Sequence, residues 1–298
     1  MGIDALRTDD RRFGDLPDWP YSPHYLEDLP GYEGLRVHYI DEGPPDAEVM
    51  LCLHGEPTWA YLFRRMIPVF LEAGYRVVAP DYFGFGRSDK PVDDAVYTFD
   101  FHRNALLAFV ENLDLSEITL VVQDWGGLLG LTLPVAFPNR ISGLLIMNTA
   151  FAVGAKPTEG FIAWRDYVAN RPDFGVGRLM GQTVPHLSPE EIAAYEAPFP
   201  TPEHKAGVRT FPALVPTDPS MGGVEVSRLA IKWWSEQFDG RSFMAIGMTD
   251  PVLGPYVMER VHKVIRNCPE PMRVEEAGHF VQEWGEQVAR AALAAWDD

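Results

Sequence analysis

The segment that most constrains this chain is residues 118–130, with the sequence ITLVVQDWGGLLG. Its first five residues are mostly β-branched or aliphatic and predict a buried strand. The strand pattern stops just before Asp124, and an apolar helical pattern begins after the glycine pair at 126–127. A strand, a sharp turn and a helix in this order present the side chain of the turn at one end of a sheet. Asp124 occupies that turn.

Two interpretations of Asp124 fit this segment. In the first, Asp124 is the nucleophile of an α/β-hydrolase elbow, because an ionised carboxylate needs no general base and attacks a saturated carbon that bears a leaving group. In the second, Asp124 only caps the following helix, a position that aspartate favours. Val122 counts against the first interpretation, since an elbow usually has a small residue two positions before the nucleophile. The segment alone leaves both open.

The rest of the chain predicts an α/β fold. Buried strands alternate with helical patterns along most of the sequence, which is typical of a mainly parallel sheet. An antiparallel start is expected, and residues 1–20 are expected to form an arm with little structure of its own. The expected strands are residues 24–29, 35–41, 49–53, 76–80, 118–122, 143–149, 242–247 and 272–275. Helices are expected, among others, at residues 59–73 and 99–112.

The alternation fails between residues 155 and 223, where no strand-like run occurs. This stretch has proline and glycine breaks, short amphipathic segments and many aromatic residues. It is expected to be a helical cap, inserted over the carboxyl edge of the sheet. The predicted domains are therefore a core of residues 1–154 and 224–298 and a cap of residues 155–223.

Three reactive side chains follow three predicted strands: Asp124, Asp250 and His279. Ligand sites in open α/β sheets form outside the carboxyl ends of the strands, so these side chains can meet. Individually, Asp250 before Pro251 is an ordinary turn residue, and His279 after Gly278 could simply begin a helix. Together they follow the order nucleophile, acid and histidine of the α/β-hydrolases, and the sequence therefore predicts a catalytic triad.

Four segments carry a resemblance to a known family. They are HGEPTW at 54–59, DYFGFGRSDKP at 81–91, VVQDWGG at 121–127 and GHFVQEW at 278–284. The chain resembles the haloalkane dehalogenases of the α/β-hydrolase superfamily from about residue 24 to its C-terminus. The resemblance implies a mostly parallel eight-stranded sheet flanked by helices, with an inserted helical cap. HGEP together with DWGG is similar to the subgroup whose acid follows the strand after the cap, which fits Asp250, and this subgroup accepts valine at position 122.

The resemblance also implies a two-step reaction. Asp124 would displace halide from a haloalkane to form an ester, and His279, oriented by Asp250, would activate the water that hydrolyses it. The products would be a primary alcohol, a halide ion and a proton. The backbone N–H groups of Glu56 and Trp125 would stabilise the oxyanion. No cofactor and no metal are implied.

Halide binding in this family requires N–H donors in a dry pocket, and the resemblance assigns them to Trp125 and Trp164. Trp164 is the single tryptophan between residues 155 and 223. Either indole could instead only fill space, Trp125 beside the turn and Trp164 within the cap. Five phenylalanines are candidates for the pocket wall or for the core: Phe151, Phe161, Phe174, Phe199 and Phe211.

Composition limits the partners of the chain. A net charge of −18 leaves no basic surface for nucleic acid or for an anionic membrane. Two cysteines make no disulfide framework, and neither a signal peptide nor a membrane span is evident. The expected protein is a cytoplasmic monomer that binds a small haloalkane, water and the halide product.

Two other functions remain possible from the sequence. An epoxide hydrolase also uses an aspartate elbow, and it needs acidic groups in the cap that Tyr167 and Tyr195 could provide. A receptor built on the same fold would bind a small molecule without turnover.

Overall fold

The computed structural model describes residues 2–297, and its centre is a mainly parallel sheet of eight strands. The strand order across the sheet is β10-β9-β8-β7-β4-β5-β3-β2, and β3 is antiparallel to both of its neighbours. This agrees with the predicted sheet. The strands are β2 (His24–Leu26), β3 (Val37–Glu42), β4 (Val49–Leu53), β5 (Arg76–Pro80), β7 (Ile118–Val122), β8 (Ile141–Met147), β9 (Arg241–Gly247) and β10 (Met272–Val274).

The middle of the sheet brings the reactive segments together. All five residues of β4 and all five of β7 are buried, as expected for apolar strands covered on both faces. β7 lies between β4 and β8 in parallel register, so that Val122 is opposite both Leu53 and Ile146. The three strands therefore end at the same level, and the loops that follow them share one edge of the sheet.

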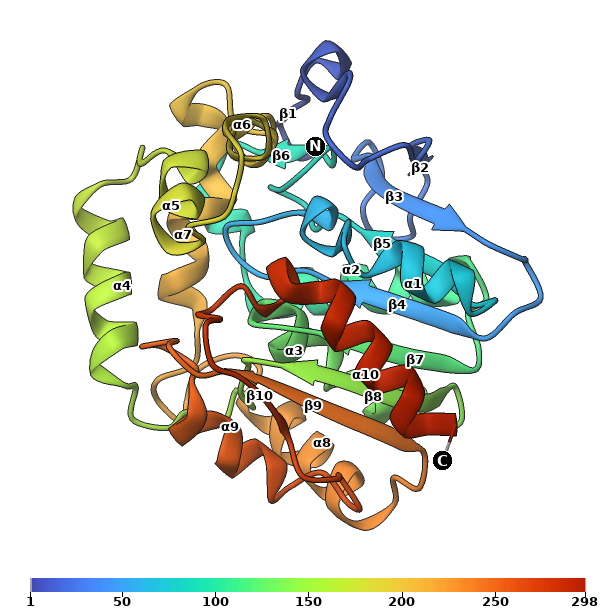
Figure 1. Cartoon of the computed structure of the whole chain (residues 1–298). Helices are drawn as coiled ribbons and strands as arrows, with labels where there is room; N and C mark the ends of the chain where they lie inside the picture. Colours follow the sequence, from blue (N-terminus) through green and yellow to red (C-terminus); the bar gives the residue numbers. More distant parts are fainter. Residues whose placement is uncertain (1, 298) are drawn as a thin grey trace.

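Helices cover both faces of the sheet (Figure 1). On one face α1 (Ile67–Glu72) contacts α10 (Gly285–Asp297). On the other face α2 (Phe99–Asn112) packs on α3 (Trp125–Gly130), and α8 (Val224–Glu236) lies beside them. None of the helices within residues 2–297 is long and apolar enough to cross a membrane.

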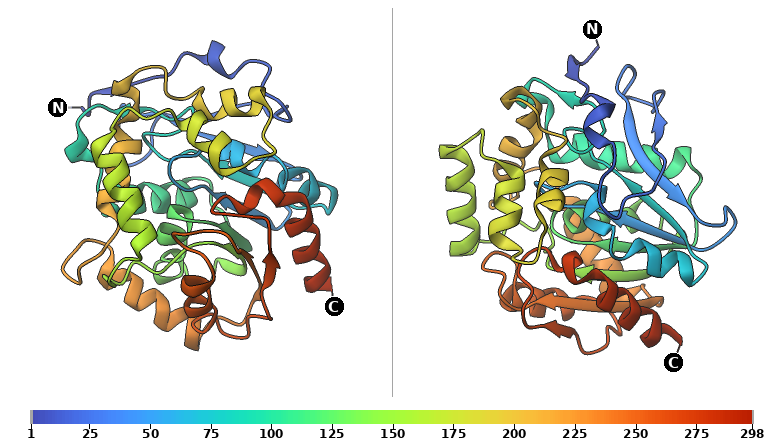
Figure 2. Two further views of the ribbon diagram at one scale, coloured as in Figure 1. Left: turned by 60° about the vertical axis from the view of Figure 1, so that its left-hand side comes forward. Right: turned by 45° about the horizontal axis from the view of Figure 1, so that its top comes forward.

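Four α-helices are inserted between β8 and α8, and they lie together beyond one end of the sheet (Figure 1 and the right-hand view of Figure 2). They are α4 (Glu159–Asn170), α5 (Val176–Thr183), α6 (Pro189–Glu196) and α7 (Ala206–Leu214). The start of α6 follows from its sequence: Ser188 and Glu191 form a capping box, and Pro189 occupies the first turn, where no N–H is needed.

The structure corrects two local expectations. Residues 2–20 are not a loose arm, because β1 (Ala5–Leu6) pairs with β6 (Lys90–Pro91) and the rings of Phe13 and Trp19 are buried against Trp59. The helix expected from residue 59 to residue 73 is divided into a 3₁₀ turn at Ala60–Phe63 and the short α1. Pro68 explains the break, because proline is tolerated in the first turn of a helix but not in its interior, and α1 therefore begins just before Pro68.

Candidate active site

Asp124 lies in a strained turn between β7 and α3. Its φ of 49° and ψ of −123° are unusual for a residue with a side chain. The turn is closed tightly, because a Cβ on Gly126 would lie 1.8 Å from the carbonyl oxygen of Leu53. The side chain of Val122 fits beneath α3 because α3 has a glycine at position 130. A Cβ at Gly130 would lie only 3.1 Å from Cγ1 of Val122. The local geometry is that of a nucleophile elbow.

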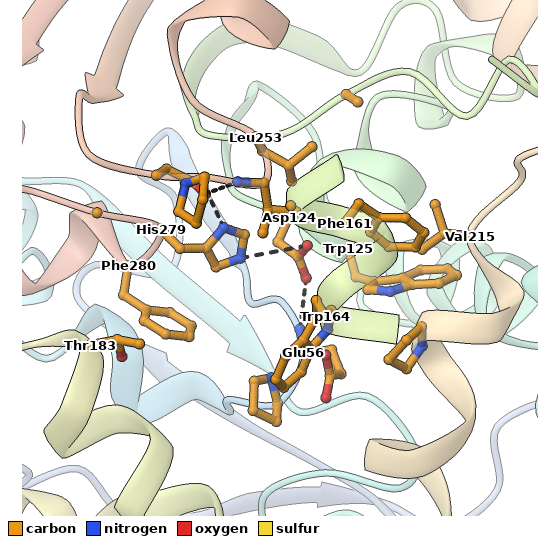
Figure 3. A pocket seen from close by; sticks show the side chains of 18 of the residues that line it. Glu56, Asp124, Trp125, Phe161, Trp164, Thr183, Val215, Leu253, His279 and Phe280 are labelled. Atoms are coloured by element: carbon orange, nitrogen blue, oxygen red, sulfur yellow. Dashed lines mark hydrogen bonds and ion pairs between the residues drawn. The ribbon is translucent and has the colours of Figure 1, made fainter. Parts of the chain in front are cut away.

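The carboxylate of Asp124 makes no capping hydrogen bond to α3, so the helix-cap interpretation is wrong. Instead its Oδ1 accepts the backbone N–H of Glu56 at 2.9 Å, while its Oδ2 lies 3.7 Å from Nε2 of His279 (Figure 3). Burial raises the pKa of Asp124, although the charge of His279 and the N–H groups of Trp125 and Glu56 oppose this rise. One oxygen is thus anchored and the other faces the histidine.

His279 is oriented by Asp250. Its Nδ1 donates to Oδ2 of Asp250 at 2.9 Å, and the same oxygen accepts an N–H of Asn148 at 2.8 Å. The backbone N–H of Val252 donates to the other oxygen of Asp250 at 2.7 Å. Burial would raise the pKa of Asp250, but His279 and these donors outweigh it, and the pKa is lowered. Burial likewise would lower the pKa of His279, but Asp250 and then Asp124 raise it to about 9.

Glu56 lies just after β4 and faces the same space. Its side chain is buried, and burial together with the charge of Asp124 raises its pKa well above the ordinary value, while a hydrogen bond from Trp164 opposes this rise. A raised pKa favours the neutral carboxylic acid. The peptide bond between Glu56 and Pro57 is cis.

All six residues that the sequence assigned to the triad, the oxyanion hole and halide binding line one pocket with a volume of about 410 Å³. These are Glu56, Asp124, Trp125, Trp164, Asp250 and His279. The inserted region also contributes to it, since Phe161 comes from α4, Leu179 from α5 and Val215 follows α7. Figure 3 shows Asp124 near the centre of this group, with His279 on one side and Trp125 on the other.

Comparison with known proteins agrees with this geometry. Residues 48–286 match the family model of the alpha/beta hydrolase fold. A haloalkane dehalogenase of Psychrobacter cryohalolentis is 42% identical, over 96% of this chain and 95% of its own length. Another, from Mycolicibacterium paratuberculosis, is 40% identical, over 94% of this chain and 93% of its own length. The chain belongs to the haloalkane dehalogenases.

A solved structure extends this result. The haloalkane dehalogenase DpaA of Paraglaciecola agarilytica, described as tetrameric, is 51% identical to this dehalogenase. It superposes with a TM-score of 0.96, and the match covers 98% of each chain.

The structure argues against an epoxide hydrolase. Neither cap tyrosine lines the pocket of this dehalogenase. Tyr195 is fully buried elsewhere, where its hydroxyl donates to Glu283 and accepts from Arg64. Tyr167 stacks on the ring of Trp164 instead. The two acidic groups required to open an epoxide are therefore not provided by these residues.

Several contributions to the site were not predicted. Asn148 directly follows β8, whereas the expected strand of residues 143–149 included it, so no predicted strand end marked it. The hydroxyl of Thr149 donates to the backbone carbonyl of Asp124 at 2.7 Å. The side-chain amide of Gln123 donates to the backbone carbonyl of His279 at 3.1 Å. These contacts hold the elbow and the histidine loop together.

The phenylalanines divide between wall and core. Phe161 lines the pocket, whereas Phe211 packs behind it, with its ring centroid 4.6 Å from that of Trp125. Phe280 lines the pocket although the sequence did not point to it. The other candidates, Phe151, Phe174 and Phe199, do not line the pocket.

Proposed function

We propose that this protein hydrolyses haloalkanes to an alcohol, a halide ion and a proton through an ester formed on Asp124. The observation that carries the proposal is the state of the Asp124 carboxylate. One of its oxygens is held by the N–H of Glu56, and the other faces a largely apolar pocket within 3.7 Å of His279. Such a carboxylate is poised to attack carbon and, once esterified, to be attacked by water.

In the first step Oδ2 of Asp124 attacks the carbon that bears the halogen. A carbon–oxygen bond forms as the carbon–halogen bond breaks, and the electron pair of that bond leaves with the halide. Because a halide is a stable anion, this step needs no proton donor. The indoles of Trp125 and Trp164, both at the pocket wall, are the proposed N–H donors to the departing ion.

In the second step Nε2 of His279 takes a proton from a water molecule, and the oxygen of that water attacks the carboxyl carbon of Asp124. The negative charge then develops on Oδ1, which already accepts the N–H of Glu56, and the N–H of Trp125 is the proposed second donor. The ester carbon–oxygen bond breaks, and the alkoxide takes the proton from His279. The carboxylic acid left on Asp124 then gives its proton to the neutral His279, which releases it to solvent as the proton product. Asp124 is restored as a carboxylate.

The charge of Asp124 explains how His279 is protonated in the free enzyme and becomes a neutral base for the second step. In the free enzyme two carboxylates, Asp250 and Asp124, raise the pKa of His279 to about 9. Esterification removes the charge of Asp124, so the pKa of His279 falls at the moment when a neutral imidazole is required. The first step thereby prepares the base for the second.

We also propose the arrangement of the chain around this chemistry. Residues 155–223 act as a cap over a core of residues 1–154 and 224–298, since α4 contributes Phe161 and Trp164 to the pocket and α5 contributes Leu179. A cytoplasmic location stays a prediction. A monomer also stays a prediction. The 51% identical relative DpaA, described as tetrameric, instead supports an oligomer. Light scattering of the purified protein decides between the two states.

The test is release of bromide from terminal bromoalkanes by the wild-type protein and by Asp124→Asn. The wild type should release bromide and alcohol in equal amounts, and the variant should be slower by about 10³-fold or more, since it lacks the nucleophile. His279→Phe should accumulate the ester, seen in intact-protein mass spectra as an increase equal to the alkyl group. A wild-type protein that binds bromoalkanes but releases no bromide would indicate a receptor and overturn the proposal, as would diol formation from styrene oxide without dehalogenation.

A further inference from the structure

The size and polarity of the pocket extend the proposed function to a substrate class, and the inference rests on that function. We infer that this dehalogenase acts best on terminal haloalkanes with chains of about six to eight carbons, and poorly on two- and three-carbon halides.

The first observation is the volume of the cavity, about 410 Å³. A methylene group or a halogen occupies roughly the volume of a water molecule, about 30 Å³. A dihaloethane would therefore fill less than about a third of the cavity, and water would share the site with it. A six- to eight-carbon chain with its halogen would fill roughly half to two-thirds of the space, closer to the density at which ligand and wall remain in contact.

The second observation is the separation of polar from apolar wall. The groups that carry charge or donate to an anion surround Asp124 and belong to the reacting end of a substrate. Most of the remaining wall is aliphatic, aromatic or proline, and a long carbon chain would bury more of its surface there than a short one. The apolar side chains of this wall include Leu128, Phe161, Leu179, Pro212, Val215 and Leu253.

Together, the volume and the apolar wall predict how kcat/KM depends on the chain length of the substrate. Each methylene moved from water to an apolar wall improves binding by about fourfold, and the transition state gains as much because the chain stays in place. The value of kcat/KM should therefore rise by about fourfold per methylene until the cavity is filled, and then level or fall. A pocket built for two-carbon halides would show its maximum at the short end.

Two residues of the inserted helices allow the wall itself to be tested. Leu179 on α5 and Val215 after α7 line the pocket, are only partly buried, and make no side-chain hydrogen bond to the triad. Replacing both by phenylalanine narrows the cavity without touching Asp124 or His279. The matched control is Leu229→Phe, since Leu229 lies 51% exposed on α8, outside the pocket.

The experiment measures kcat/KM for bromide release from 1-bromopropane, 1-bromobutane, 1-bromohexane, 1-bromooctane and 1-bromodecane. The expected maximum is at 1-bromohexane or 1-bromooctane, and the Leu179→Phe/Val215→Phe variant should lose about tenfold or more on that substrate while 1-bromopropane changes by less than about threefold. A wild-type maximum at 1-bromopropane would overturn the inference. So would a double variant that loses the same factor on every chain length.

These results are distinguishable from failure of the proposed function. If no bromoalkane of any length releases bromide, the dehalogenase activity itself fails. If bromide is released but short chains are preferred, only the inference about chain length fails.

Discussion

Arg64 and Glu283 form an ion pair with two hydrogen bonds of 2.7 Å, and neither side chain is exposed to solvent. Glu283 lies four residues after His279, in the short helix that follows the histidine loop. Arg64 also donates to Glu191 at 2.7 Å and to the hydroxyl of Tyr195, both on α6. One buried guanidinium thus connects an inserted helix to the segment that carries His279, the proposed base.

Removal of Arg64 should destabilise the protein strongly. Arg64→Met leaves the buried carboxylate of Glu283 without its main partner, and loss of one member of a buried pair lowers the free energy of unfolding by about 3–5 kcal/mol. Arg65→Met is the matched control, because Arg65 reaches the same two carboxylates with a side chain that is 30% exposed. Its loss should cost less than about 1 kcal/mol. Urea unfolding measures both, and equal losses would contradict a special role for Arg64.

Trp164→Phe should weaken halide binding while the pocket keeps an aromatic wall. The substitution removes one indole N–H, and a hydrogen bond to a charged group contributes about 1.5–3 kcal/mol, so the dissociation constant for bromide should rise by roughly 10- to 100-fold. Isothermal titration calorimetry measures it. The control is Trp284→Phe, whose ring packs on His186 outside the pocket. Trp164 would be only a packing residue if both variants bound bromide equally well.

Asn148→Ala should slow the second step more than the first. The amide of Asn148 donates to the oxygen of Asp250 that also accepts from His279, so its loss loosens the orientation of the base but leaves Asp124 in place. Hydrolysis of the ester should become roughly tenfold slower, since about one hydrogen bond to a charged group is lost, and alkylation should be unchanged. Rapid-quench mass spectrometry follows the ester. Asn170→Ala, at the exposed end of α4, is the control, and a slower alkylation in Asn148→Ala would refute this assignment.

The pKa of His279 predicts a pH-dependent contribution to stability. The pKa is raised from 6.5 to about 9, so the folded state holds the proton more tightly than the unfolded state. The resulting stabilisation is complete below pH 6.5 and is lost as the pH rises through about 9. The difference in unfolding free energy between the wild type and His279→Gln should therefore shrink by about 3 kcal/mol between pH 6 and pH 10. A difference that is constant across this range would show that the ion pair with Asp250 does not raise the pKa.

Much of the fold was predictable because its signals are local. The apolar runs of β4, β5 and β7 were assigned with their observed bounds, and α2 as well, since strand and helix periodicities are visible within five to fifteen residues. The N-terminal segment was not predictable in this way. Its order comes from the burial of Phe13 and Trp19 against Trp59, a contact between parts of the chain about forty residues apart.

The site shows the same division. Asp124, Asp250 and His279 were predictable because each follows a recognisable strand, and parallel strands end at one edge of a sheet. Asn148 follows β8 in the structure, but the expected strand of residues 143–149 included it, and an amide has no reactive signature of its own. The exclusion of Tyr195 from the pocket was not predictable, because the packing of α6 against Arg64 and Glu283 decides which way that side chain points.

By itself the sequence determined the type of sheet, the residue at the elbow and the positions of Asp124, Asp250 and His279 after three strands. These depend on periodicity and on turns, which neighbouring residues decide. The tertiary structure alone decided which oxygen of Asp124 is anchored, how large the pocket is and which aromatic side chains face it. Those features arise where segments far apart in the chain pack together, as Glu56 does with Asp124 across 68 positions, and no local pattern encodes a distance between them.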